Sequence, residues 1–201
     1  MIASNLLSLS IWVPILGAMV VLLTGSDRNA GLAKIVALLV ALAGFLVTIP
    51  LYTNFDSAKS AMQFVEQAPW IPQYNINYFL GVDGISVLFI LLNSFITILV
   101  VLAGWRVIEK KTSQYMAAFL VMSGLMNGIF CALDAVLFYV FFEASLIPMY
   151  IIIGVWGGPN RVYAAFKFFL YTLAGSLLML LSLMYLFLQS GSFNILDWHT
   201  L

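Results

Sequence analysis

Long uninterrupted apolar runs are the feature that most restricts how this chain can fold. An α-helix rises 1.5 Å per residue, so a hydrocarbon core about 30 Å thick is crossed by roughly 20 apolar residues. This ruler predicts an all-α fold, a polytopic bundle of about six transmembrane helices. The predicted spans are residues 6–24, 34–51, 84–105, 113–132, 134–156 and 163–189.

The boundary between the fourth and fifth spans follows from length. Residues 113–156 are almost continuously apolar, and as one helix they would be about 65 Å long, twice the thickness of the bilayer core. We therefore expect a tight reversal near Leu133 and Asp134, which places Asp134 at an interface.

Residues 52–83 form the only sizeable extramembrane segment that this division leaves. Alternation from Tyr74 to Tyr78 predicts a short strand or hairpin there, and Pro69 and Pro72 argue against a helix. Asp83 directly precedes the third span and is expected to cap it, since carboxylates favour helix starts. No residue of this segment suggests catalysis.

The composition excludes several function classes. The chain is 64% hydrophobic and 8% charged, with a mean hydropathy of +1.09, whereas soluble domains are about 25% charged. Its zero net charge offers no basic surface to nucleic acid. A single cysteine, Cys131, and a single histidine, His199, cannot build an iron–sulfur or zinc site, and no glycine-rich nucleotide motif occurs. We expect no cofactor or metal site in this chain.

The distribution of positive charge predicts the orientation. The loops after the first, third and fifth spans carry most of the lysines and arginines, whereas the opposite side has Lys59 alone. The amino terminus is therefore predicted on the non-cytoplasmic side. Because no basic residue precedes Arg28, the first apolar run is interpreted as a retained span rather than a cleaved signal. The residues on the cytoplasmic side are Arg28, Lys34, Arg106, Lys110, Lys111 and Arg161.

Glu143 is the most informative polar residue within the predicted spans. An ionisable group at bilayer depth costs at least about 2.5–3.5 kcal/mol, so it indicates a function or a partner. Glu143 lies near the middle of the fifth span and shares a helix face with Tyr139 and Tyr150. Pro148 has no N–H for the carbonyl of Ala144, which leaves a polar group beside the carboxylate. A proton-handling role is favoured over a purely structural carboxylate that locks helix packing.

Lys167, one turn into the sixth span, has two interpretations that the sequence leaves open. It lies on a face with Tyr163 and Tyr171, where it either takes part in proton transfer or reaches the interface and orients the span. In an antiparallel pair of spans, Glu143 and Lys167 would lie at different depths. A water-linked relay is then as plausible as a salt bridge.

Two softer polar patterns in the third and fourth spans are interpreted as helix packing rather than a pathway. Small residues four apart allow close helix approach, and amides and hydroxyls can bond between helices. The residues are Ser86, Asn93 and Thr97 in the third span, and Ser123, Gly124, Asn127 and Gly128 in the fourth.

Two stretches resemble a known family. FYVFFEASLIPMYIIIGVWGGPNRVYAAFKFFLYTLAGS, residues 138–176, and APWIPQYNINYFLGVDGIS, residues 68–86, are similar to the subunit M family of proton-pumping NADH:quinone oxidoreductase, respiratory complex I, whose mitochondrial counterpart is subunit 4. The clusters E-x-x-x-x-P-M-Y and F-K-F-F-L-Y-T are specific, and the resemblance covers essentially the whole chain. Mrp-type sodium/proton antiporters are more distant relatives.

The resemblance implies more than the residues alone. Glu143 matches the key glutamate of the family's fifth span, at the centre of a proton half-channel, and Lys167 matches the lysine of the sixth. Residues 1–111 would be an amino-terminal three-span region, and residues 112–201 the first part of an antiporter-like inverted repeat. The chain would be the amino-terminal portion of the subunit, since the partner lysines of the next spans are not in it.

The assembly implied by the resemblance has its redox chemistry elsewhere. Flavin, iron–sulfur clusters and quinone would lie in partner subunits, and the partners would be antiporter-like membrane subunits and lipid in a hetero-oligomer. The location would be the bacterial inner membrane, or the mitochondrial inner membrane if the chain is organellar. Two alternatives stay open: an Mrp-type cation/proton antiporter subunit, and a non-catalytic scaffold chain.

Overall fold

The computed structural model describes residues 5–24 and 30–200. Six helices in this part of the chain are long and apolar enough to cross a membrane, and their bounds confirm the predicted spans to within a few residues. Arg28 lies outside the described residues, and the orientation of the amino terminus stays a prediction. The helices are α1 (Leu6–Thr24), α2 (Ala30–Thr53), α3 (Gly84–Val107), α4 (Thr112–Cys131), α5 (Ala135–Trp156) and α6 (Arg161–Ser190).

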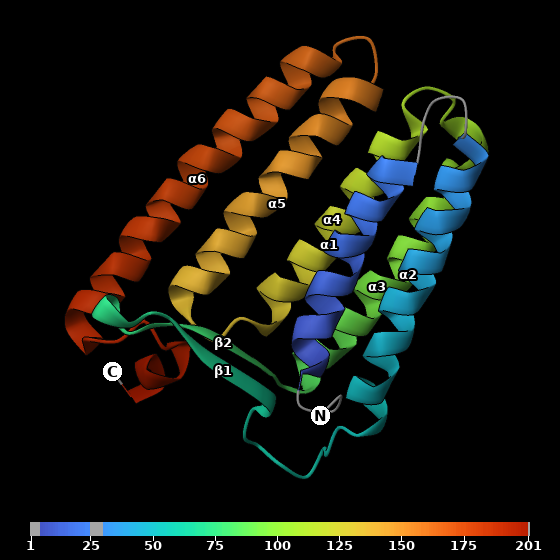
Figure 1. Cartoon of the computed structure of the whole chain (residues 1–201). Helices are drawn as coiled ribbons and strands as arrows, with labels where there is room; N and C mark the ends of the chain where they lie inside the picture. The colour runs from blue at the N-terminus through green and yellow to red at the C-terminus, as the bar shows by residue number, and fades with distance from the viewer. Residues whose placement is uncertain (1–4, 25–29, 201) are drawn as a thin grey trace.

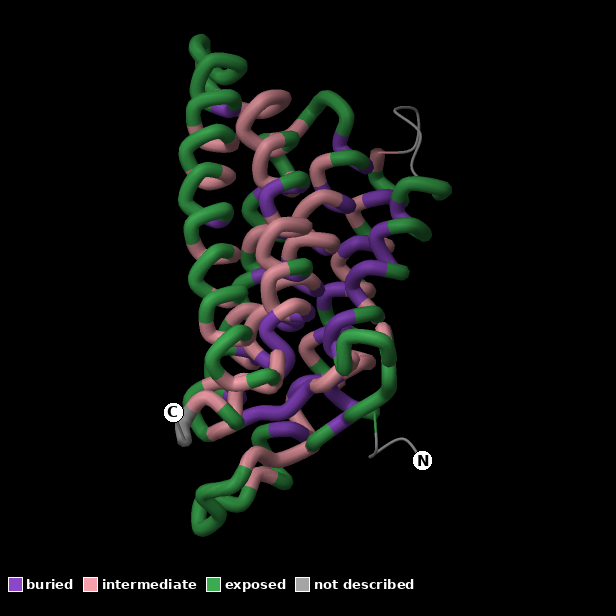
Figure 2. The backbone as a smooth tube through the Cα atoms, turned by 90° about the vertical axis from the view of Figure 1, so that its left-hand side faces the viewer, coloured by how far each residue is buried: buried purple, intermediate pink, exposed green. Residues whose placement is uncertain are grey.

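The first four helices form a bundle, against which α5 and then α6 are added in sequence (Figure 1). Each helix runs antiparallel to the one before it. Buried residues are concentrated in the bundle, while α6 is largely exposed along its length (Figure 2). Its buried residues, Ala165 and Ser176, both belong to the face turned toward α5.

The reversal predicted near Leu133 and Asp134 is confirmed. Helix α4 ends at Cys131 and α5 begins at Ala135, with Asp134 as its N-cap. The Asp134 carboxylate accepts hydrogen bonds from the backbone N–H groups of Val136 and Leu137, which would otherwise lack partners in the first turn.

The predicted hairpin is also present, and it is longer than the alternation indicated. Strand β1 (Gln63–Ile71) pairs antiparallel with β2 (Ile76–Val82) through the short 3₁₀ helix η3 (Pro72–Tyr74). Pro69 is accommodated because a strand of a two-stranded sheet always has one unpaired edge. The hairpin lies across the end of the bundle (Figure 1).

Asp83 caps α3 as expected. Its carboxylate accepts a hydrogen bond of 2.7 Å from the Ser86 N–H, and this bond lowers the pKa of Asp83. Ser86 is thereby engaged at the start of the helix and does not join the polar residues farther along α3.

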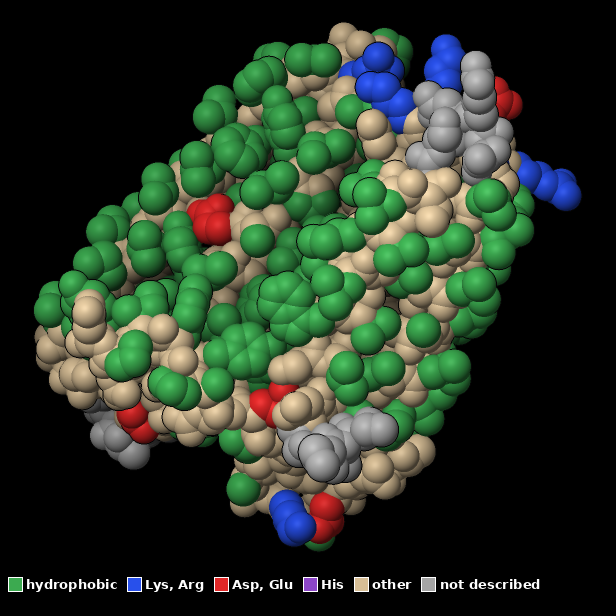
Figure 3. All heavy atoms as spheres, viewed as in Figure 1, with side chains coloured by type: hydrophobic (Ala, Val, Ile, Leu, Met, Phe, Trp, Pro, Cys, Tyr) green, Lys and Arg blue, Asp and Glu red, His purple; other side chains and the backbone are tan. Residues whose placement is uncertain are grey.

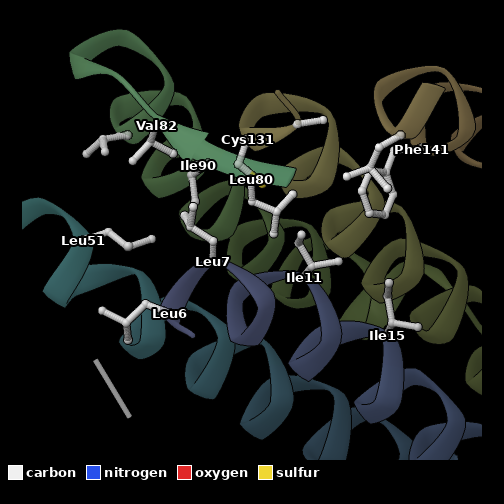
Figure 4. Packing of buried hydrophobic residues seen from close by; sticks show 13 residues of the cluster. Leu6, Leu7, Ile11, Ile15, Leu51, Leu80, Val82, Ile90, Cys131 and Phe141 are labelled. Atoms are coloured by element: carbon white, nitrogen blue, oxygen red, sulfur yellow. The ribbon is translucent and has the colours of Figure 1, made fainter. Parts of the chain in front are cut away.

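Two hydrophobic clusters hold the bundle together. One lies at the hairpin end, where side chains of α1, α3, α4 and α5 pack against β2 (Figure 4). The other lies toward the opposite end and is built mainly from small residues of α1, α2 and α4. Its members are Ala18, Val21, Ala33, Ala37, Ala41, Val101, Met116, Ala117 and Leu120.

A polar layer separates these clusters and confirms the packing interpretation of the stripes. Asn93 of α3 donates to the Ser123 carbonyl at 2.9 Å and to Asn127 Oδ1 at 2.8 Å, both on α4. Gly124 lies so close to α1 that an added Cβ would be 2.5 Å from the carbonyl oxygen of Ile11. The absent side chain is what lets the two backbones approach.

Candidate functional site

The Glu143 carboxylate is shared between α5 and α6. It is half-buried, and its Oε1 accepts a hydrogen bond of 2.9 Å from the Tyr139 hydroxyl, one turn earlier on α5. The Ser176 hydroxyl of α6 donates to the same oxygen. A carboxylate that the sequence places near the middle of its span therefore has two hydroxyl donors, one from each helix.

Ser176 has an alternative acceptor. Its Oγ also lies 2.9 Å from the carbonyl oxygen of Leu173 on α6. A hydroxyl carries one hydrogen, so Ser176 donates either to Glu143 or to Leu173 at any moment. The Ser176 hydroxyl can therefore exchange one acceptor, the Glu143 carboxylate, for the other, the Leu173 carbonyl.

Tyr150 lies in the same interface between α5 and α6, closer to the loop that joins them. Its ring contacts Phe166 and Phe169 edge-on, with centroid distances of 5.7 and 5.6 Å. These contacts fix the register of the two helices near Glu143. The shared face predicted for Tyr139, Glu143 and Tyr150 is therefore the face turned toward α6.

Pro148 interrupts no helix: α5 continues through it to Trp156. The side chain is buried and points to a different side of α5 from Glu143. It lines an apolar groove of about 400 Å³ between α1, α4 and α5. The groove residues are Leu22, Gln114, Ala117, Ala118, Val121, Ile147, Pro148 and Ile151.

Lys167 and Glu143 are not brought together. The ammonium of Lys167 lies 5.8 Å from the centre of the Tyr163 ring, on the exposed side of α6. Ser176, which faces Glu143, is farther along α6 by about 13 Å of helix axis. Tyr171, the other neighbour on the face of Lys167, is 84% exposed. Glu143 and Lys167 therefore lie at different levels along the paired helices, as the antiparallel arrangement predicted.

Sequence reasoning missed two residues with clear structural partners. Ser176 gave no signal, since a single serine in an apolar helix is common. Glu66 gave none either, because it precedes the alternating segment and looks like a loop residue. It is in fact buried, and its carboxylate accepts hydrogen bonds from the Leu7 and Ser8 N–H groups at 2.8 and 3.1 Å, capping α1 from the hairpin.

Charged groups gather at the two ends of the molecule and leave a mostly hydrophobic belt between them (Figure 3). At the hairpin end, Lys59 pairs with Asp56 at 3.3 Å. The Ala58 N–H and then Lys59 lower the pKa of Asp56. Beside Glu66, burial raises the pKa of Tyr78, whose hydroxyl is 3.1 Å from Ser8 Oγ.

No group of three His, Cys, Asp or Glu side chains able to hold a metal ion occurs within residues 5–24 and 30–200. The chemistry that this arrangement offers is the gain and loss of one proton at Glu143, within reach of two hydroxyl groups.

Two family models match the sequence of this chain. Residues 132–200, which contain the site, match the family model described as "NADH:quinone oxidoreductase/Mrp antiporter, TM". Residues 32–133, about half of the chain, match the model described as "NADH-ubiquinone oxidoreductase chain 4, amino terminus". The chain belongs to the NADH-ubiquinone oxidoreductase chain 4 family.

Members of the chain 4 family are similar along nearly the whole sequence. NADH-quinone oxidoreductase subunit M of Rhodobacter capsulatus is 48% identical, over 95% of this chain and 37% of its own length. NADH-ubiquinone oxidoreductase chain 4 of Arabidopsis thaliana is 44% identical, over 89% of this chain and 36% of its own length. The chain spans less than half the length of these relatives.

Solved structures show the same fold. A chain of respiratory complex I from Thermus thermophilus matches with a TM-score of 0.80 and 31% identity, over 98% of this chain and 38% of its own length. A chain of the Mrp complex from Dietzia sp. DQ12-45-1b matches with a TM-score of 0.79 and 18% identity, over 94% of this chain and 20% of its own. The second likeness is one of fold alone.

Proposed function

We propose that this chain is a membrane-embedded, proton-translocating part of an NADH:quinone oxidoreductase, with Glu143 as its protonatable group. The observation that carries the proposal is the position of the Glu143 carboxylate between α5 and α6, hydrogen-bonded by Tyr139 and Ser176. Membership of the chain 4 family supplies the reaction with which the proton transfer would be coupled.

The proposed mechanism is a charge-state relay. A low dielectric disfavours the ionised carboxylate, while hydroxyl donors and an approaching cation favour it. When Glu143 takes up a proton, its own O–H becomes a donor, and the Ser176 hydrogen can turn to the Leu173 carbonyl. When the proton leaves, Ser176 turns back. Glu143 would thus release or bind a proton according to the charge nearby.

Lys167 is proposed as the second proton-transferring group, with Tyr150, Pro148 and Tyr171 in supporting positions. About 13 Å of α6 separates Lys167 from the level of Glu143, so any exchange of protons between them must run through intervening polar groups or water.

We propose two regions in the chain. They are residues 1–111, with the non-cytoplasmic loop 52–83, and residues 112–201, the start of an antiporter-like repeat.

The energy for transport would come from partner subunits. We propose that these hold the flavin, iron–sulfur clusters and quinone, and that the chain works in a hetero-oligomer with antiporter-like neighbours in a bacterial or mitochondrial inner membrane. Structural neighbours drawn from multi-subunit complexes support this assembly.

The test is Glu143→Gln in the complete complex. The amide keeps the size of the side chain and removes its protonation, so we expect proton pumping to fall at least about tenfold while the complex still assembles. Proton uptake by sealed vesicles during NADH oxidation is the measurement. Asp56→Asn, the same change at an exposed carboxylate of the hairpin end, is the control and should pump normally.

Other outcomes separate the alternatives. Normal pumping by the Glu143→Gln complex would contradict the proposal and favour a scaffold role. Purification with a cofactor-free membrane assembly, rather than with flavin and iron–sulfur subunits, would favour an Mrp-type cation/proton antiporter.

A further inference from the structure

A small polar cavity lies in the centre of the α1–α4 bundle, in the layer between the two hydrophobic clusters. It offers about 10 Å³ of room for the centre of a water-sized sphere. Its lining belongs to α1–α4 alone, so the cavity is separate from the Glu143 site. The lining residues, all of them buried, are Ser10, Pro14, Ala41, Gly44, Ser94, Thr97, Ser123 and Asn127.

Gly44 shows that the space is open at this level. It is buried, yet a Cβ added to it would meet no heavy atom within 4 Å. The other buried glycines of the bundle behave differently: an added Cβ would lie 2.2 Å from Val40 at Gly17 and 2.5 Å from Ile11 at Gly124. The bundle is therefore closely packed at Gly17 and Gly124 and loosely packed at Gly44.

Pro14 explains why polar groups gather here. Proline has no N–H, so the carbonyl of Ser10, one turn earlier on α1, lacks its helical partner. Asn127 of α4 supplies one, donating from Nδ2 to the Ser10 oxygen at 3.0 Å. The same Nδ2 donates its second hydrogen to the Ser94 hydroxyl at 3.4 Å.

Hydrogen-bonding capacity remains beside the cavity, and two groups matter here. The Ser94 hydroxyl accepts from Asn127 and, within the described part of the chain, donates to no acceptor. Asn127 Oδ1 accepts from Asn93, and a carbonyl oxygen has a second lone pair. The Ser94 hydroxyl as a donor and Asn127 Oδ1 as an acceptor thus line a cavity about as large as one water molecule requires.

We propose that this cavity is a binding site for one structural water molecule, which accepts a hydrogen bond from Ser94 and donates one to Asn127 Oδ1. Buried waters make two to four hydrogen bonds and need about this much room. The lining side chains are neutral and include N–H and O–H donors, which suits water better than a cation. Through Asn127 the water would link α3 and α4 to the proline-exposed carbonyl of α1.

The test is a cryo-EM map of the complete complex containing this chain, at a resolution where other buried waters are visible. We expect one peak within hydrogen-bond distance of Ser94 Oγ and Asn127 Oδ1. In Gly44→Ala the new methyl group occupies the space, so the peak should disappear while the helices keep their positions. Gly31→Ala is the matched control, an exposed glycine of the same helix with nothing within 4 Å of the new Cβ. It should keep the peak.

Three results would overturn the proposal: no peak in the unmodified complex, a peak that persists in Gly44→Ala, or a peak surrounded by five or more oxygen atoms at cation distances. If Gly44→Ala fails to assemble, the map of the unmodified complex decides alone, by the presence or absence of the peak and by the number of its neighbours.

Discussion

Glu143 receives its hydrogen-bond donors from two different helices. Tyr139 belongs to α5 and moves with the carboxylate, whereas Ser176 belongs to α6. Any change in the spacing of the two helices therefore alters the Ser176 bond first. Ser176 would act as a positioning residue for the carboxylate that we propose as the protonatable group.

Removing the Ser176 hydroxyl should slow pumping without abolishing it. A hydrogen bond to a charged group contributes about 1.5–3 kcal/mol, and the lower end of this range corresponds to about a tenfold change in rate. Because Glu143 keeps its bond from Tyr139, we expect Ser176→Ala to lower the pumping rate by about this lower factor. Ser176→Thr restores a hydroxyl and should recover most of the rate. Vesicle pumping assays at matched NADH oxidation give the comparison.

Ser182→Ala provides the control on the same helix, because its hydroxyl is exposed and, among the described residues, bonds only to the Leu178 carbonyl. Equal losses in Ser176→Ala and Ser182→Ala would show a general effect on α6 rather than one on Glu143.

For single residues, the sequence indicates a functional role where the polarity of a side chain conflicts with that of its neighbours. Glu143 attracts attention because a carboxylate is costly in an apolar span. Ser176 does not, since serine satisfies itself by bonding to its own helix, as it also does here with Leu173. Glu66 owes its importance to Leu7 and Ser8, residues almost sixty positions away, and no local pattern contains that pairing.

Helices, as elements, were predictable because hydropathy and length are decisive for spans of about 20 residues. Asp83 and Asp134 marked the starts of α3 and α5 for the same local reason, since carboxylates bond to free N–H groups. Strand β1 was not predictable. It turns Glu66 inward and includes Pro69, so the regular alternation of a half-buried strand is lost.

Close approach of α4 to α1 depends on Gly124. In Gly124→Ala the new Cβ would lie 2.5 Å from the carbonyl oxygen of Ile11, a backbone atom that moves only if α1 moves. Overpacking of this kind costs about 1–3 kcal/mol, so we expect a lower unfolding temperature for the complex in detergent. Gly175→Ala on α6 meets nothing within 4 Å and should match the unmodified protein. Equal melting of both variants would contradict this packing.

The whole molecule is asymmetric in charge along the direction of its helices. Within the described residues, Lys34, Arg106, Lys110, Lys111 and Arg161 lie toward the end opposite the hairpin, while Lys59 lies in the loop before β1. The positive-inside rule then predicts that the hairpin faces away from the cytoplasm.

Cysteine labelling can test this orientation. In intact cells or sealed mitochondria-derived vesicles of known sidedness, a membrane-impermeant maleimide should react with Lys59→Cys from the non-cytoplasmic side. Lys110→Cys should react only after the membrane is opened. The native Cys131 is buried and serves as the unreactive background. The reverse pattern of reactivity would show the opposite orientation.

The turn between α4 and α5 is bonded on both sides. The Leu133 N–H donates to the Phe79 carbonyl of β2, and the Ile195 N–H donates to the Leu133 carbonyl. Helix α5 is thus held at the turn just before its first residue, and a tilt of the helix would pivot near its N-cap, Asp134. Displacement in a pivoting rod grows with distance from the pivot, and Tyr150, about 24 Å along the axis, would travel nearly twice as far as Glu143, about 13 Å along it. A small sideways displacement of α5 at the aromatic contacts of Tyr150 would therefore move the Glu143 carboxylate by about half as much.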